Sequence, residues 1–290
     1  MLQKMATQTL GLNAEGLRQP QIIAVTSGKG GVGKSTMSVN MGLMMQRLNR
    51  KVLVVDADIH LGNVDFILGI RPEYTIADVV RGTIGVEEAL VALNGGIDIL
   101  PAAGAAPELL EAGDGVLQKL ARSFKGLENR YDVIIFDTGA GISQLVLNFV
   151  LGCDKTVLLV TPDPASLADA YAVIKVVRGH NRRMPIIMTA NMVRSHEEGD
   201  VLYKKMNLMV NRFLGGHIDF GGAILRDDMV STSIKQQRPF VMDHPNSSTT
   251  KALRMINQRI LKMPNDKTNE GMPFFERFIL NRRKMAGDNL

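Results

Sequence analysis

A glycine-rich segment near the N-terminus has the residues needed to bind the phosphates of a nucleotide. It matches the pattern G-x-x-x-x-G-K-[ST] and reads Gly28-Lys29-Gly30-Gly31-Val32-Gly33-Lys34-Ser35-Thr36. Glycines let consecutive backbone N–H groups turn inward around phosphate oxygens, and a helix beginning near Lys34 adds its positive end. Lys34 would neutralise the β- and γ-phosphates, and the Ser35 hydroxyl would ligate Mg²⁺. The segment therefore predicts a site for a nucleotide with Mg²⁺.

Three carboxylates follow two apolar runs farther along the chain. Asp56 and Asp58 end the run KVLVVDAD, and Asp137 ends the run DVIIFD. Carboxylates at the carboxyl ends of parallel strands face the ligand crevice of an open α/β sheet. An apolar strand that ends in Asp, about a hundred residues after a phosphate loop, is typical of a Mg²⁺-holding carboxylate, so Asp137 is the predicted metal residue. The glycines Gly139 and Gly141 would let the backbone after it respond to a γ-phosphate.

The elements that must position these side chains are short runs of Val, Ile and Leu that alternate with helical stretches. Such alternation predicts an α/β fold with a mostly parallel sheet and helices on both faces. The expected strands are Gln21–Thr26, Lys51–Asp56, Ile97–Leu100, Asp132–Asp137, Thr156–Thr161 and Pro185–Asn191. The expected helices include Lys34–Leu48, Leu167–Arg178 and Ser247–Met263.

The composition excludes several classes of protein. The chain has 290 residues, 45% of them hydrophobic, which is enough for a packed core. Its one cysteine, Cys153, leaves no intrachain disulfide, no Cys-based zinc site and no iron–sulfur cluster within one chain. No apolar run approaches the ~18 residues that span a bilayer, and residues 1–20 lack the core of a signal peptide. The composition fits a reducing cytoplasm.

The C-terminal segment carries the net charge of +5, with nine Lys/Arg and four Asp/Glu between Lys251 and Leu290. Within it Phe274, Phe275, Phe278 and Ile279 fall on one helical stripe with basic residues beside them. This pattern predicts an amphipathic helix on a membrane surface, and it makes a nucleic-acid partner unlikely. The alternative is a helix that packs on the core of its own domain. The polar run Pro264–Met272 predicts a linker that detaches this tail.

The loop KGGVGKS resembles the deviant phosphate loop of the MinD/ParA ATPases. The resemblance implies a P-loop fold, ATP and Mg²⁺ as cofactors, and a homodimer in the ATP state, with Lys29 reaching the phosphates of the partner. By the same resemblance Asp58 orients the attacking water, Asp56 supports the Mg²⁺ shell and Asn63 contacts the dimer partner. Asn191 would contact adenine, and Asp227, in ILRD, would flank the base although relatives have Pro at Leu225.

Within that family the chain looks like the FlhG/FleN type, which regulates flagellar number and placement. The segment Asn13–Arg18 resembles the N-terminal element of that type, with Leu12 and Asn13 departing from its pattern. By the resemblance the segment from Asp56 to Asp65 is the first switch of the family, and the segment from Asp137 to Ser143 is the second. The second switch reads DTGAGIS, as in the FlhG/FleN type, and the tail is a further match. The implied partners are an FlhF-like GTPase and a flagellar transcription activator.

The sequence pattern divides the chain into an arm (1–20), a domain (21–263) that the resemblance makes a MinD-like ATPase domain, and a linker with a membrane-binding tail (264–290). We expect it in the cytoplasm, peripheral on the inner face of the cell membrane when ATP is bound. The alternatives are a MinD-like division ATPase, a ParA-like partitioning ATPase, or a nucleotide-sensing anti-activator whose hydrolysis is incidental.

Overall fold

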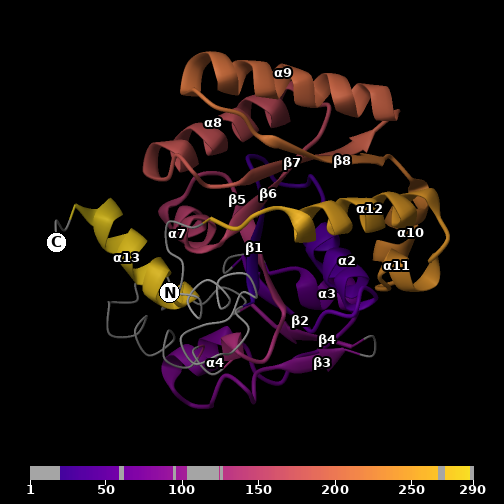
Figure 1. Cartoon of the computed structure of the whole chain (residues 1–290). Helices are drawn as coiled ribbons and strands as arrows, with labels where there is room; N and C mark the ends of the chain where they lie inside the picture. The colour runs from indigo at the N-terminus through magenta and orange to yellow at the C-terminus, as the bar shows by residue number, and fades with distance from the viewer. Residues whose placement is uncertain are drawn as a thin grey trace, which may run out of the picture.

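One eight-stranded sheet forms the centre of the molecule (Figure 1). The computed structural model describes residues 20–58, 62–93, 96–102, 124, 127–266 and 272–287. The strands lie in the order β3-β4-β2-β5-β1-β6-β7-β8, and only the β3–β4 pair is antiparallel. Their bounds are β1 Gln21–Ser27, β2 Val52–Ala57, β3 Val91–Leu93, β4 Ile97–Leu100, β5 Val133–Ala140, β6 Lys155–Val160, β7 Ile186–Val193 and β8 Asp219–Leu225.

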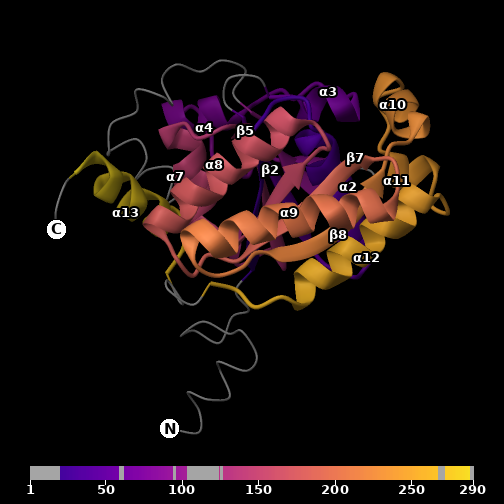
Figure 2. The same cartoon turned by 90° about the horizontal axis from the view of Figure 1, so that it is seen from above.

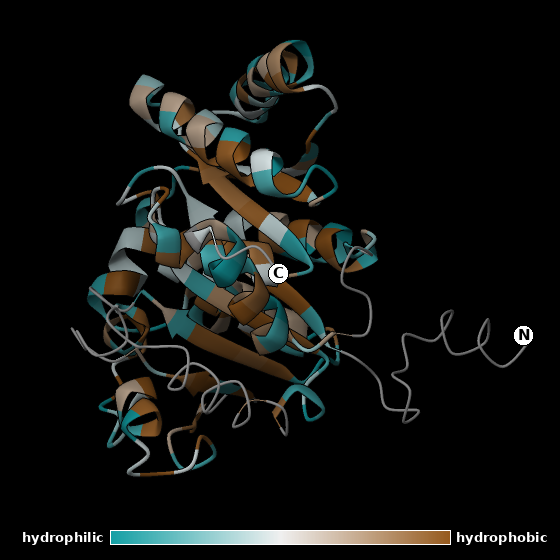
Figure 3. Cartoon of the chain, turned by 90° about the vertical axis from the view of Figure 1, so that its left-hand side faces the viewer, coloured by the Kyte–Doolittle hydropathy of each residue, from teal (hydrophilic) through white to brown (hydrophobic). Residues whose placement is uncertain are grey.

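The predicted fold class is confirmed. Each expected strand is present within three residues of its predicted ends, and β2 and β6 are buried along their whole length. Such continuous burial is what the unbroken Val/Ile/Leu runs predicted, since helices cover both faces of a parallel sheet. In Figure 3 the central strands are mostly brown, whereas the helices carry brown and teal on different sides.

The helices form two layers, one on each face of the sheet (Figures 1 and 2). One hydrophobic cluster joins a face of the sheet to α4, α7, α8, α9 and α13, and a second joins the other face to α2, α3, α11 and α12. The helix bounds are α2 Lys34–Gln46, α3 Val64–Leu68, α4 Ile76–Arg81, α7 Gln144–Gly152, α8 Pro164–His180, α9 His196–Leu214, α10 Asp228–Lys235, α11 Phe240–Asp243, α12 Ser248–Lys262 and α13 Phe274–Ala286. Among the described helices, none is long and apolar enough to cross a membrane.

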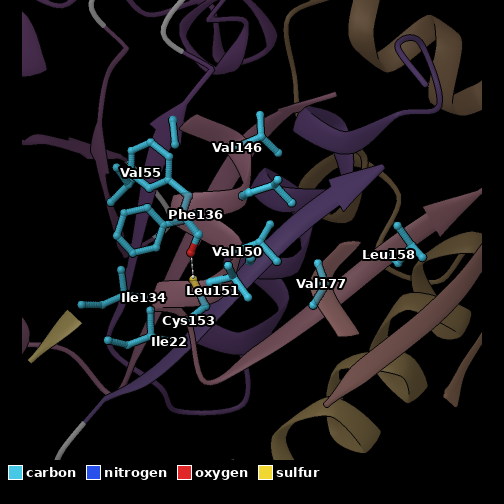
Figure 4. Close-up of a cluster of buried hydrophobic side chains, with 14 of the residues drawn as sticks. Ile22, Val55, Ile134, Phe136, Val146, Val150, Leu151, Cys153, Leu158 and Val177 are labelled. Atoms are coloured by element: carbon cyan, nitrogen blue, oxygen red, sulfur yellow. Dashed lines mark hydrogen bonds between the residues drawn. The ribbon is translucent and has the colours of Figure 1, made fainter. Parts of the chain in front are cut away.

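The first cluster surrounds the single cysteine (Figure 4). Cys153 follows α7, is buried, and contacts the carbonyl oxygen of Phe149 through Sγ at 3.2 Å. Burial raises the pKa of its thiol well above the ordinary value. Cys153 is therefore a packed core residue and not a reactive thiol.

The C-terminal helix α13 packs against α7 and is not detached from the core. Phe274, Phe275 and Phe278 are each 1% exposed. They lie within aromatic contact distance of three core rings, Phe124, Phe136 and Phe149. The structure thus corrects the expectation of a detached tail and shows the alternative, a helix packed on its own domain. Ile279 is partly buried in the same cluster.

Two segments with sequence-based expectations lie wholly or partly outside the described residues. Residues 1–19, with the segment Asn13–Arg18, are among them, as are 267–271 of the linker. The first described residues lie next to the C-terminal segment, since Gln21 donates from Nε2 to the carbonyl of Leu261 at 3.2 Å. The start of β1 therefore lies close to the point where α12 ends.

Candidate functional site

The glycine-rich loop connects β1 to α2 at the carboxyl edge of the sheet. Gly31 and Gly33 have φ values of 76° and 90°, a region that L side chains rarely adopt. A Cβ on Gly28 would clash with the backbone of Asp169 and Ala170 in α8. The loop conformation therefore depends on glycine, as the motif predicted.

Lys34 is the first residue of α2 and is 9% exposed. Burial lowers its pKa, and the nearby carboxylates of Asp137 and Asp58 oppose that shift. The structure thus brings together a lysine from the loop and carboxylates from β5 and the end of β2. A cation held at a helix N-terminus beside exposed loop N–H groups suits an anionic phosphate ligand.

Asp137 lies in β5 directly beside Asp56 of β2 and is fully buried. Burial raises the pKa of Asp137 to about 6, while the Ser35 and Ser38 hydroxyls and Lys34 favour its ionised form. Ser38 donates to Oδ1 at 2.8 Å. Oδ2 accepts no hydrogen bond of normal geometry from the described residues. An ionisable oxygen with an open coordination position beside the Ser35 hydroxyl fits a Mg²⁺ ion or its bound water.

Asp56 uses both carboxylate oxygens to hold the segment that follows β2. Oδ1 accepts from the backbone N–H of Asp58 and Oδ2 from that of Val64, each at 3.1 Å. Burial, followed by the charge of Asp137, raises its pKa well above the ordinary value. Asp56 therefore positions the first switch segment in this structure. Its predicted part in the Mg²⁺ shell stays a prediction.

Asp58 and the second switch segment lie close together. A Cβ on Gly139 would lie 3.5 Å from Oδ1 of Asp58. The same segment is tied to β1, because Gly141 donates its N–H to the carbonyl of Ser27 at 2.8 Å. Residues 59–61 are outside the described part of the chain, and Asn63 is exposed at the start of α3. The two predicted switches thus converge beside the phosphate loop.

Lys29 points out of the loop and forms an ion pair with Asp163 of the same chain. Both side chains are exposed, and the carboxylate raises the pKa of the ammonium group. Asp163 also caps α8 by accepting the N–H of Ala165 at 3.2 Å. In this structure Lys29 is therefore not part of the phosphate cradle of its own chain.

A cavity of about 250 Å³ lies beside the loop, where a nucleotide base would extend from the phosphates. Gly33, Asn191 and Asp227 are among its lining residues. Asn191 donates from Nδ2 to the carbonyl of Val32 at 2.8 Å, so its amide holds the loop and leaves its oxygen for another donor. Asp227 caps α10 through Met229 and accepts the hydroxyl of Thr249 at 2.7 Å, so both of its oxygens have partners within the chain.

Two residues of this site did not follow from the sequence. Ser38 lies one helical turn after Lys34. This spacing could have indicated that the two residues lie on the same side of α2. Asp163 lies in TPDP after β6, and nothing in that spacing connects it with a loop 134 residues earlier. The contacts of Lys29 with a partner chain, and those of Asn191 and Asp227 with a base, stay predictions.

Comparison with known proteins agrees with this geometry. The family model described as "AAA domain" matches residues 20–187, more than half of the chain. The antiactivator FleN of Pseudomonas aeruginosa is 35% identical over 244 residues, covering 84% of this chain and 87% of that protein. The flagellum site-determining protein YlxH of Helicobacter pylori is 30% identical over 239 residues, covering 81% and 80%.

A solved structure has the same fold. The septum site-determining protein MinD of Pyrococcus horikoshii, complexed with Mg-ADP, superposes with a TM-score of 0.71 at 24% identity, over 84% of this chain and 96% of that one. The matched length, the phosphate loop and the converging carboxylates agree with one another. The chain therefore belongs to the MinD-like family of P-loop ATPases that includes FleN and YlxH.

Proposed function

We propose that the protein hydrolyses ATP with Mg²⁺ at the carboxyl edge of the sheet. The observation that carries this proposal is the convergence of Lys34, Ser35 and Asp137 in one buried corner of the phosphate loop. Lys34 would hold the β- and γ-phosphates, while Ser35 and Asp137 would hold Mg²⁺. Asn191 and the adjoining cavity would receive the adenine. Asp58, beside Gly139 in the second switch, would orient the attacking water.

We further propose that ATP binding drives formation of a homodimer. Lys29 is exposed and its ion pair is with an exposed carboxylate, so little free energy opposes its transfer to a new partner. In the dimer its ammonium group would leave Asp163 and contact the phosphates bound to the other chain. Asn63, exposed at the start of α3, would lie at the same interface.

The cellular role that we propose is control of flagellar number and placement. The relatives named as the antiactivator FleN and the flagellum site-determining protein YlxH support it, since each matches four fifths or more of this chain. An FlhF-like GTPase and a flagellar transcription activator would be the partners. The protein would work in the cytoplasm and on the inner face of the cell membrane.

Membrane binding would require α13 to leave the core. Burial of each phenylalanine stabilises the docked helix by roughly 1.5–3 kcal/mol, so a free monomer would keep the helix docked. A released helix could insert Phe274, Phe275 and Phe278 between lipids, with Arg282, Arg283 and Lys284 near anionic headgroups. Two released helices on one dimer bind far better than one because of effective concentration.

Co-sedimentation with phosphatidylglycerol-containing vesicles tests this switch. The wild-type protein should bind with a non-hydrolysable ATP analogue and remain in the supernatant with ADP. Gly152 offers a matched variant, since a Cβ there would lie 2.8 Å from Cε2 of Phe274. Gly152→Val should displace α13 and allow binding with ADP. Equal binding of the wild type in both nucleotide states would refute the switch.

A further inference from the structure

Two neighbouring segments concentrate positive charge without any carboxylate. Residues 170–183 and 201–218 contain no Asp or Glu. Their basic residues are Lys175, Arg178, Arg182 and Arg183 in the first segment and Lys204, Lys205 and Arg212 in the second. All except the half-buried Arg178 are exposed. This charge lies outside the ATP site and outside the C-terminal tail.

The structure brings the two segments together at the C-terminal ends of α8 and α9. The helices run side by side (Figure 2). The guanidinium group of Arg178 donates to the carbonyl of Arg182 and, at 2.8 Å, to that of His217, and so joins the loops after both helices. Lys175 lies one turn before Arg178 on the same side of α8. Its side chain is exposed and lies about 60° around the axis of α8 from Arg178, toward solvent.

The ring of Phe213 at this place is 65% exposed, and the guanidinium carbon of Arg212 lies over it, 5.3 Å from the ring centroid. Phe213 follows Met206 by seven residues, so both lie on the same side of α9. Met206 is fully buried, whereas Phe213 is 65% exposed. Tyr203 stacks on Phe220 of the edge strand β8, at the other flank of α9. Phe213 is about 80° around the axis from Tyr203, which places it on the flank nearer α8.

We propose that this surface, formed by Lys175, Arg182, Arg183, Arg212 and Phe213, binds an acidic peptide segment of a partner protein. An apolar side chain of the peptide would pack on Phe213, since aromatic residues are enriched in interfaces relative to the rest of the surface. Carboxylates on either side would pair with the exposed basic residues. The nearby carboxylates of Asp219 and Asp266 act instead on the half-buried Arg178 and on Asn181. The proposal does not depend on nucleotide binding.

A peptide fits this surface better than a membrane does. The other exposed apolar residues of α9, Val201 and Leu208, lie on its outer side. Leu208 points about 140° away from Phe213 around the helix axis. A flat bilayer could not contact both, whereas a narrow peptide could bind along the α8 flank alone.

Selection from a display library of random 12-residue peptides on the full-length protein tests the proposal. The selected peptides should be enriched in Asp or Glu flanking a Leu, Ile or Phe. A synthetic copy should bind the variants Phe213→Ser and Lys175→Glu about tenfold or more weakly than the wild type. Leu208→Ser, on the same helix, and Met255→Ser, a 66% exposed residue of α12, are matched controls that should bind like the wild type.

Three outcomes would overturn the proposal. One is a selection without acidic–apolar enrichment. Another is a loss on Leu208→Ser equal to the loss on Phe213→Ser, which would place the contact on the outer side of α9. The third is that the wild type binds phosphatidylglycerol vesicles in the presence of ADP and that Phe213→Ser and Lys175→Glu both abolish this binding. The occupant of the surface would then be lipid. Circular dichroism should show that all four variants are folded, since each changes an exposed side chain.

Discussion

Arg277 of α13 donates to Oδ1 of Asp154 at 2.6 Å, and the two side chains are 5% and 11% exposed. The other oxygen of Asp154 accepts the N–H of Ile22 at 2.8 Å. One carboxylate thus joins the start of β1, where the N-terminal arm enters the domain, to the C-terminal helix. The docked helix is therefore held by a buried ion pair as well as by its phenylalanines.

Arg277→Ala should destabilise the folded protein by about 3–5 kcal/mol, because it leaves the buried charge of Asp154 unpaired. The free energy of unfolding in urea measures this. Arg254→Ala, at an exposed position of α12, is the control and should change stability by less than about 0.5 kcal/mol. An unchanged free energy of unfolding in Arg277→Ala would show that the pair contributes nothing to docking.

Glu128 should make stability depend on pH. Its Oε1 accepts the N–H of Phe274 at 3.0 Å, and burial raises its pKa from 4.5 to about 7. Between those values the folded state binds a proton that the unfolded state has lost, so this group makes stability fall as pH rises from 4.5 through 7.

The Glu128→Gln variant isolates this effect. Between pH 5 and pH 8 the free energy of unfolding should fall less in Glu128→Gln than in the wild type. The difference between the two falls should be about 1–3 kcal/mol. Asp137 and Asp56 also have raised pKa values and contribute to the slope in both proteins. Urea unfolding at several pH values measures the difference. Parallel stability curves for the two proteins would contradict the assignment.

Lys34→Ala should weaken nucleotide binding by about 2–5 kcal/mol, because the phosphates lose a buried cation that no neighbouring residue replaces. Titration of a fluorescent ATP analogue measures the affinity. Lys251→Ala, at an exposed position of α12, should bind the analogue like the wild type. Equal affinities in the two variants would remove Lys34 from the phosphate site.

Asp58→Ala should retain ATP and the dimer but lose turnover, by roughly 10²-fold or more, because the attacking water loses its orienting carboxylate. Phosphate release measures turnover, and light scattering during size-exclusion chromatography measures mass. A variant that binds ATP and remains monomeric would refute the role assigned to Asp58.

Much of the fold and part of the site could be predicted because their signals are local. The loop from Gly28 to Thr36 lies between a buried strand and a helix, so its nine residues predict their own conformation. Asp137 was found in the same way, as the end of an apolar strand. Strand β8 was not predicted, because Gly221 and Gly222 interrupt its apolar run. The Lys29–Asp163 pair was not predicted either, because it joins loops that only the sheet order brings together.

The sequence by itself determined that Phe274, Phe275 and Phe278 share one face of a helix and that this face must be buried away from water. It did not determine what covers that face, since an apolar stripe fits a membrane and a protein core equally well. Only the tertiary structure decided this, by placing α7, the strand residue Phe136 and the carboxylate of Asp154 where α13 can reach them. The physical reason is that periodicity reports which side chains avoid water, whereas their partners depend on contacts between residues far apart in the chain.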